Sequence, residues 1–131
     1  MIAVLDASAA VGIVFARDDA AAARDAVQQA DGILAPGLFI SEVTNTIWKY
    51  VQFQGLEQNE AERALDYCLG LPDDFADDRD LHREAFSLSC GSSRSAYDMF
   101  YIALARRNDA MILTLDQKVK QLAESLSIRT L

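Results

Sequence analysis

Residues 2–8 read IAVLDAS and residues 111–117 read MILTLDQ. Each stretch begins with a short run that is wholly apolar in the first case and apolar except for Thr114 in the second. Each run ends at an aspartate, Asp6 or Asp116, before a helical pattern begins. Short apolar runs of this kind predict strands buried on both faces, as in a parallel sheet covered by helices. Because such sheets bind ligands beyond the carboxyl ends of their strands, both aspartates are expected to face one crevice.

Outward from these two strands, apolar strands and helical patterns alternate along the chain. Further strands are expected at residues 33–35, where Pro36 stops the run, near Phe75, and at residues 128–131. Helices are expected at residues 9–14, 19–30, 37–53, 57–69, 81–89, 95–107 and 117–125, with a loop at residues 90–94. The chain shows no internal repeat or linker, so the prediction is one α/β domain over residues 1–131.

The composition indicates a globular protein with an acidic surface. Apolar residues make up 51% of the 131 residues, and 20 acidic side chains against 12 basic ones give a net charge of -8. This balance counts against RNA binding through a simple basic surface, but it suits a carboxylate site for divalent cations or a cationic partner. No apolar run approaches the roughly 20 residues of a membrane span, and no secretory signal precedes the first strand, so a cytoplasmic protein is expected.

Several kinds of catalytic site are excluded by the residues that the chain lacks. His82 is its only histidine, which excludes RNA cleavage by a pair of histidines and disfavours a Cys/His zinc site. Cys68 and Cys90 form no C-x-x-C pair and are expected to be reduced thiols in the core. No G-x-S-x-G motif or Gly-rich phosphate loop is present. Any chemistry must therefore depend mainly on carboxylates.

Asp6 and Asp116 could each have a purely structural role instead of a catalytic one. An aspartate directly before a helix commonly caps that helix, and nothing in either position alone separates capping from catalysis. Asp98 is harder to explain in this way, because its helix is apolar almost all round and a buried carboxylate costs several kcal/mol unless it is paired or binds a metal. An ion pair between Asp98 and Arg94 is the structural alternative there.

Glu42 lies in the helix that follows the second strand, with Asn45 and Lys49 on the same face. Its alternative is an exposed polar stripe opposite the apolar face of that helix. The functional interpretation is stronger when four carboxylates are considered together, because each lies at or beside the carboxyl end of an expected strand. These four, here called the acidic quartet, are Asp6, Glu42, Asp98 and Asp116. Several oxygen ligands suit Mg²⁺ or Mn²⁺, ions that support phosphodiester hydrolysis.

The chain resembles the PIN domain, and in particular the VapC toxins of bacterial type II toxin–antitoxin pairs. Residues 4–10 read VLDASAA, residues 42–45 read EVTN, residues 97–105 read YDMFYIALA and residues 113–116 read LTLD, in the family's order. The resemblance covers nearly the whole chain. It departs most over residues 54–94, which are unusually acidic around residues 73–80.

The resemblance implies a three-layer α/β/α sandwich with a parallel five-stranded central sheet. It also implies a ribonuclease in which the acidic quartet holds one or two Mg²⁺ or Mn²⁺ ions, with Asp6 and Asp98 as the surest ligands. Ser8, Asn45 and Thr114 match positions that orient the carboxylates or the attacking water. Family members cut RNA, commonly form homodimers and are inhibited by a small cognate antitoxin.

Two alternatives from other classes stay open. One is a non-catalytic PIN-like module that binds a protein partner, although no member of the acidic quartet is missing here. The other is an unrelated Mg²⁺-dependent phosphohydrolase, but residues 6–8 read DAS where such enzymes often carry a D-x-D motif. The acidic residues 73–80 are expected to form a solvated loop, and Trp48, Tyr50 and Phe53 to be core or dimer contacts.

Overall fold

The computed structural model describes all residues 1–131. Four strands, eight helical elements and short loops make up the chain. The strands are β1 (Ile2–Leu5), β2 (Gly32–Pro36), β3 (Asp74–Ala76) and β4 (Met111–Leu113). The helices are α1 (Ala7–Val14), the 3₁₀ turn η1 (Asp18–Ala20), α2 (Ala21–Gln29), α3 (Leu38–Gln54), α4 (Gln58–Leu69), α5 (Asp78–Ser92), α6 (Ala96–Asn108) and α7 (Gln117–Ser125).

The strands form one parallel sheet in the order β3-β2-β1-β4. This confirms the predicted parallel α/β fold, but the sheet has four strands rather than the expected five. Residues 128–131 contribute only one bridge, between Thr130 and Ile112. The backbone N–H of Ile128 also donates to the carbonyl of Ala123 in α7 rather than to a strand.

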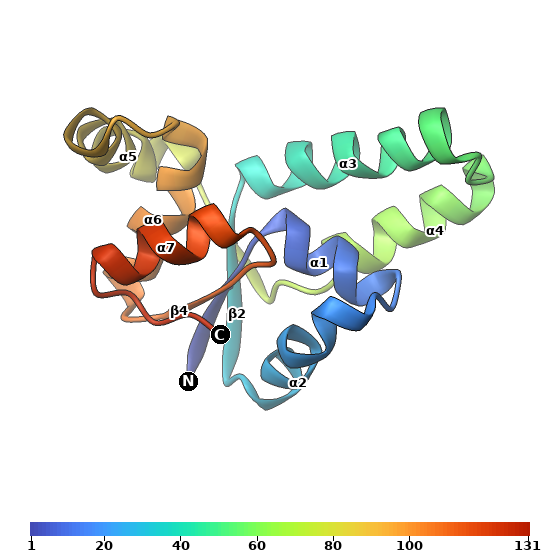
Figure 1. Cartoon of the computed structure of the whole chain (residues 1–131), viewed down its shortest axis with the longest axis horizontal. Helices are drawn as coiled ribbons and strands as arrows, with labels where there is room; N and C mark the ends of the chain where they lie inside the picture. The colour runs from blue at the N-terminus through green and yellow to red at the C-terminus, as the bar shows by residue number, and fades with distance from the viewer.

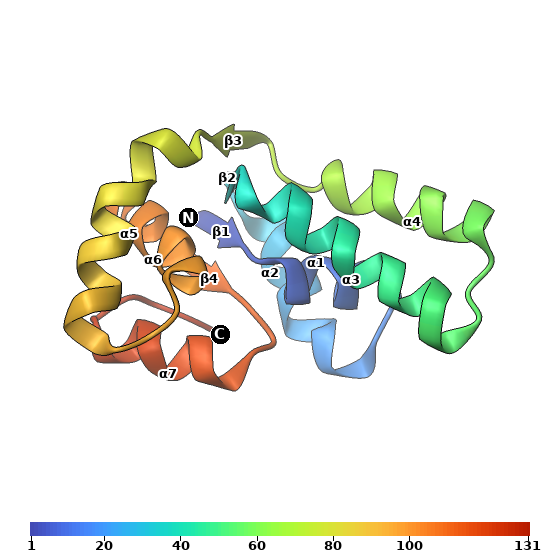
Figure 2. The same cartoon turned by 90° about the horizontal axis from the view of Figure 1, so that it is seen from above.

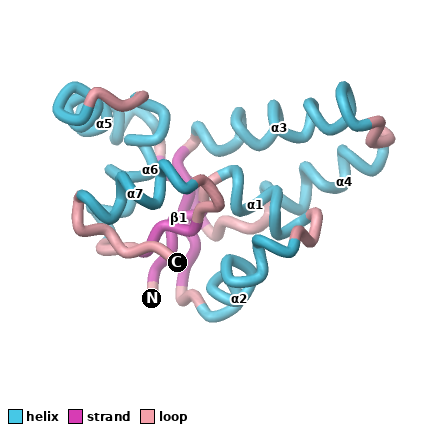
Figure 3. Tube along the Cα trace, in the orientation of Figure 1, coloured by secondary structure: helices cyan, strands magenta, loops and turns pink.

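Helices cover both faces of the sheet. Figure 1 shows α5, α6 and α7 on one side of the strands and α1, α2 and α4 on the other, and Figure 3 shows the strands gathered between them. Seen from above in Figure 2, α3 and α4 run side by side as a hairpin that extends away from the sheet. Gly55 makes the sharp turn between them in a left-handed conformation, with a φ of 71° that favours glycine.

The residues with apolar periodicity are the ones that fill the core. Phe39, Val43 and Ile47 form the buried face of α3, as their spacing predicts, and α6 packs against the sheet with buried residues almost all round. The largest fully buried side chains include Phe39, Leu5, Leu81, Met99, Ile102, Ile112 and Leu113. None of the helices is both long enough and apolar enough to cross a membrane.

The acidic residues 73–80 are more ordered than a solvated loop. They contain the expected short strand β3 and the first turn of α5, and four of their carboxylates accept backbone N–H groups. Asp73 accepts the N–H of Ile33 at 2.8 Å, and Asp78 accepts the N–H of Leu38 at 3.2 Å, in the first turn of α3. Each of these hydrogen bonds joins residues 40 positions apart, so no short-range sequence pattern predicts them.

Three further expectations are corrected by the structure. Helix α5 continues to Ser92, so most of the expected loop at residues 90–94 is helical, and Cys90 on it is exposed rather than in the core. Cys68 is buried, as expected. Trp48 and Phe53 are exposed and pack edge to face on each other, so of the two expected roles, core or dimer contact, their exposure excludes only the core.

Candidate functional site

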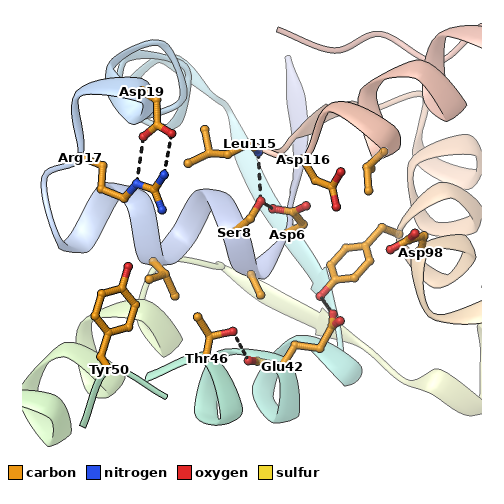
Figure 4. A pocket seen from close by; sticks show the side chains of 14 residues that line it. Asp6, Ser8, Arg17, Asp19, Glu42, Thr46, Tyr50, Asp98, Leu115 and Asp116 are labelled. Atoms are coloured by element: carbon orange, nitrogen blue, oxygen red, sulfur yellow. Dashed lines mark hydrogen bonds and ion pairs between the residues drawn. The ribbon is translucent and has the colours of Figure 1, made fainter. Parts of the chain in front are cut away.

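A cavity of about 470 Å³ opens where the carboxyl ends of β1 and β4 meet the start of α6 and the first half of α3. All four members of the acidic quartet line it, although they come from parts of the chain 110 residues apart. Figure 4 shows their carboxylates around this cavity. The other lining residues are Ala7, Ser8, Val11, Arg17, Asp19, Thr46, Tyr50, Tyr101, Leu115 and Val119.

Asp6 is the most deeply buried member of the quartet, with 7% of its surface exposed. It follows β1 and caps α1, because its Oδ1 accepts the backbone N–H of Ala9 at 2.9 Å. The same oxygen accepts the hydroxyl of Ser8 at 2.7 Å, and Oδ2 accepts the hydroxyl of Thr114. Three donors therefore fix this carboxylate, so capping and lining the cavity are compatible roles.

Ser8 and Thr114 tie the two strand ends together. The Ser8 hydroxyl oxygen accepts the backbone N–H of Leu115 at 3.0 Å, and the Thr114 hydroxyl oxygen accepts that of Asp116 at 3.0 Å. Thr114 is fully buried. Asp116 in turn caps α7 by accepting the N–H of Lys118 at 2.8 Å, and its exposed carboxylate borders the cavity. Both hydroxyls therefore set the spacing between Asp6 and Asp116.

Glu42 is not part of an exposed polar stripe. Its side chain is half-buried, and the Tyr101 hydroxyl donates to Glu42 Oε1 at 2.5 Å (Figure 4). Tyr101 is itself buried in α6, so this bond joins α3 to α6 across the cavity. Asn45, by contrast, is exposed and does not line the cavity, and Thr46, one turn beyond Glu42, lines it instead.

Asp98 accepts the fewest hydrogen bonds of the four carboxylates. It lies in the first turn of α6, where a negative charge suits the helix dipole, but no protein group donates a hydrogen bond to its carboxylate. The ion pairs of the chain do not include one between Asp98 and Arg94. The structural alternative for Asp98 is therefore not realised.

The cavity is electrostatically unfavourable for its own carboxylates. Burial is the largest effect that raises the pKa of Asp6, Glu42 and Asp98 above the ordinary values of their side chains. Repulsion from a neighbouring carboxylate raises each pKa further, with Asp116 acting on Asp6 and on Asp98. The hydrogen bonds to Asp6 and Glu42 act in the opposite direction and lower the pKa.

The donor set fits a hard divalent cation. The quartet offers only carboxylate oxygens, the ligands that Mg²⁺ and Mn²⁺ prefer, and a cation among them would relieve both burial and repulsion. No three acidic, histidine or cysteine side chains are already gathered at one point for a metal ion. The carboxylates must therefore move inward to share an ion, and Asp98, which accepts no hydrogen bond from the protein, has the fewest constraints on such a movement.

Several polar lining residues were not singled out as site residues from the sequence, among them Tyr101, Thr46 and Arg17. Tyr101 lies three residues after Asp98 and Thr46 lies four residues after Glu42, so helical spacing could have placed both on the cavity side. Arg17 follows α1 in an irregular segment, where no periodicity exists to indicate a direction.

Comparisons with known proteins agree with this architecture. The family model for the PIN domain matches residues 3–125. Ribonuclease VapC3 from Pyrobaculum aerophilum is 31% identical over 127 residues, covering 92% of each chain.

Solved structures show the same fold at lower identity. The protein PAE2754 from Pyrobaculum aerophilum superposes with a TM-score of 0.77 at 18% identity, covering 99% of this chain and 83% of that one. VapC20 from Mycobacterium tuberculosis, described as a sarcin–ricin loop cleaving toxin, superposes with a TM-score of 0.66 at 15% identity, covering 91% and 93%. Since the family model spans most of the residues and the sequence relative aligns over nearly its full length, the chain belongs to the PIN domain family.

Proposed function

We propose that this protein is an endoribonuclease that depends on Mg²⁺ or Mn²⁺ and hydrolyses RNA phosphodiester bonds with the acidic quartet as its catalytic site. The observation that carries the proposal is the meeting of four carboxylates from distant parts of the chain around one cavity. The raised pKa of three of them supports a cation-binding role, because no member of the quartet forms an ion pair with an arginine or lysine of the protein. The similarity to a ribonuclease supports RNA as the substrate.

Each residue of the site has a proposed task. A divalent cation bound by the quartet would polarise the phosphoryl oxygen and make water more acidic. The chain's own contribution is to hold the carboxylates ready for that ion. Ser8 and Thr114 fix Asp6, and Tyr101 orients Glu42 through its hydroxyl. Asp98 and Asp116 complete the donor set from α6 and from the start of α7.

The test is cleavage of a labelled structured RNA by the purified protein, with Mg²⁺, with Mn²⁺ and with EDTA. Asp98→Asn removes one charge from the cavity with almost no change in shape, and Asp66→Asn makes the same change on the exposed surface of α4. We expect metal-dependent cleavage that is lost in Asp98→Asn and kept in Asp66→Asn. Full activity of Asp98→Asn, or cleavage that persists in EDTA, would contradict the proposal.

We also propose a small antitoxin protein as the natural inhibitor, and a homodimer as the active assembly. Structural neighbours include a toxin–antitoxin complex from Klebsiella pneumoniae and VapBC-1 from Haemophilus influenzae, and the net charge of -8 suits a cationic inhibitor segment. Light scattering tests the assembly, with a mass twice that of the chain expected. The alternative of a non-catalytic binding module requires partner binding without any RNA cleavage.

A further inference from the structure

The cavity extends beyond the acidic quartet. Its volume of about 470 Å³ is that of a pocket for an organic ligand, larger than one or two hydrated ions require. Figure 4 shows Arg17, Asp19 and Tyr50 on the opposite side of the cavity from Asp98. Arg17 is the only cationic side chain among the 14 lining residues. One side of the cavity is therefore acidic, and the other presents a cation beside an aromatic ring.

Asp19 orients the guanidinium of Arg17. Arg17 Nε lies 3.1 Å from Asp19 Oδ1 and Nη2 lies 2.8 Å from Oδ2, so the carboxylate engages one edge of the planar group. The remaining N–H groups can donate to another anion, and a planar donor fork matches a phosphate group. The backbone position is fixed too, because the Arg17 N–H donates to the carbonyl of Gly12 at 2.9 Å.

Tyr50 gives this side of the cavity a firm wall. Its ring stacks on Phe15, with 4.7 Å between ring centroids and an angle of 19° between the planes, and it is half-buried. In Figure 4 its hydroxyl points toward Arg17. Aromatic rings beside a cation are a common way to hold single-stranded nucleic acid, because they contact both the nucleoside and the backbone.

The charge distribution indicates which part of an RNA would lie there. The quartet repels phosphate unless cations intervene, whereas Arg17, although paired with Asp19, keeps guanidinium N–H groups that can donate to a phosphate. We propose that Arg17 binds the RNA phosphate next to the one that is cut, with Asp19 orienting its guanidinium and Tyr50 supporting the adjoining nucleotide. The inference rests on the proposed nuclease function, and it makes the substrate an extended single strand rather than an isolated phosphodiester.

The test measures RNA binding as a function of salt. Fluorescence anisotropy of a short labelled single-stranded oligoribonucleotide is recorded with Mg²⁺ in the Asp98→Asn background, which prevents cleavage. Arg17→Ala and Arg17→Lys are compared with Arg63→Ala, which removes an exposed arginine of α4 that does not line the cavity. Each single-strand phosphate contact contributes about 0.7 to the slope of log affinity against log salt.

We expect Arg17→Ala to weaken RNA binding about tenfold and to lower the salt slope by about 0.7. Arg17→Lys should keep the slope of the parent protein, and Arg63→Ala should keep both the affinity and the slope. An equal slope in Arg17→Ala and Arg63→Ala would overturn the inference, and so would a parent protein that binds no RNA. Cleavage by the wild-type protein is scored separately. A nuclease that cuts RNA while its Arg17 variants bind normally would refute this subsite and leave the proposed function standing.

Discussion

At the scale of single residues, the acidic quartet divides into a fixed part and a movable part. Three hydrogen bonds hold the Asp6 carboxylate, and one from Tyr101 holds Glu42. Asp116 is exposed at the rim and accepts one bond, from the backbone N–H of Lys118. Asp98 accepts none and is the movable member. A site that is half preorganised in this way can position an ion on its rigid side and close around it from the other.

Thr114→Val tests the rigid part. The change keeps the shape of the side chain but removes the hydroxyl that donates to Asp6 and accepts the N–H of Asp116. We expect RNA cleavage to fall about 10- to 100-fold, the usual cost of losing a partner that orients a metal ligand. Thr44→Val, an exposed change on α3, is the matched control and should retain full activity. Equal activity of the two variants would argue against this role for Thr114.

The pH dependence of stability tests the movable part. Because the pKa of Asp98 is raised in the folded chain, the folded state holds its proton more tightly than the unfolded state does. Its contribution to stability is therefore fully present below the unfolded pKa of about 4 and is lost as pH rises through the folded pKa. In EDTA, Asp98→Asn should melt above the wild type by an amount that grows between about pH 4 and pH 7.

This stabilisation at pH 7 would appear as a higher melting temperature of Asp98→Asn than of the wild type. Thermal unfolding followed by circular dichroism measures it, with Asp66→Asn as the control whose difference from the wild type should not vary with pH. A lower melting temperature for Asp98→Asn at pH 7 would show that the carboxylate is stabilising without metal, contrary to the geometry.

At the scale of elements, helix α3 determines where Glu42 lies. Its first turn is held on one side by Asp78, which accepts the N–H of Leu38, and on the other by Phe39, which is fully buried beside Phe75. Glu42 follows one turn later and meets Tyr101 of α6. The position of this carboxylate therefore depends on packing at the start of its helix as well as on its own hydrogen bond.

Phe39→Ala tests this packing. Emptying a fully buried phenylalanine site should cost about 3–5 kcal/mol of the free energy of unfolding. Phe86→Ala on α5 is the matched control, because Phe86 is 68% exposed and should cost no more than about 0.5 kcal/mol. Urea unfolding of both variants measures the difference. Similar costs for the two substitutions would contradict the placement of α3.

The elements that carry a clear periodicity were predictable from the sequence, and the ones that depend on distant contacts were not. The strands before Asp6 and Asp116 are continuous apolar runs, so their burial and the placement of both carboxylates followed directly. The prediction of a strand at residues 128–131 was wrong, because an apolar run does not fix its backbone hydrogen bonds: the Ile128 N–H donates to Ala123 of α7, and only Thr130 forms a bridge to the sheet. The hydrogen bond between Tyr101 and Glu42 joins residues 59 positions apart, so the sequence pattern could not predict it.

At the scale of the whole molecule, the sheet gathers acidic residues that the sequence keeps apart. Parallel strands bring their carboxyl ends to one edge, so residues 6 and 116 meet there, while α3 and α6 bring residues 42 and 98 to the same cavity. The cost of this arrangement is repulsion within a chain that already carries a net charge of -8. A protein built in this way should be more stable with divalent cations than without them.

Thermal unfolding with and without Mn²⁺ tests this expectation. A ligand that binds only the folded state at 100 times its dissociation constant stabilises that state by about 2.7 kcal/mol. We expect the wild type to melt several degrees higher in Mn²⁺ than in EDTA, and Asp98→Asn to show a smaller gain, because three of the four carboxylates remain to hold the ion. A shift of equal size in both proteins would place the ion elsewhere on the acidic surface.

The central claim is that the four carboxylates act together as one metal-dependent nuclease site, and RNA cleavage at increasing Mn²⁺ tests it most directly. The variants Asp6→Asn, Glu42→Gln, Asp98→Asn and Asp116→Asn are compared with wild type and with the surface control Asp66→Asn. We predict that each of the four loses most cleavage activity while Asp66→Asn matches the wild type at every Mn²⁺ concentration. Cleavage at the wild-type rate by all four variants would contradict the account, because it would place the catalytic site outside this cavity.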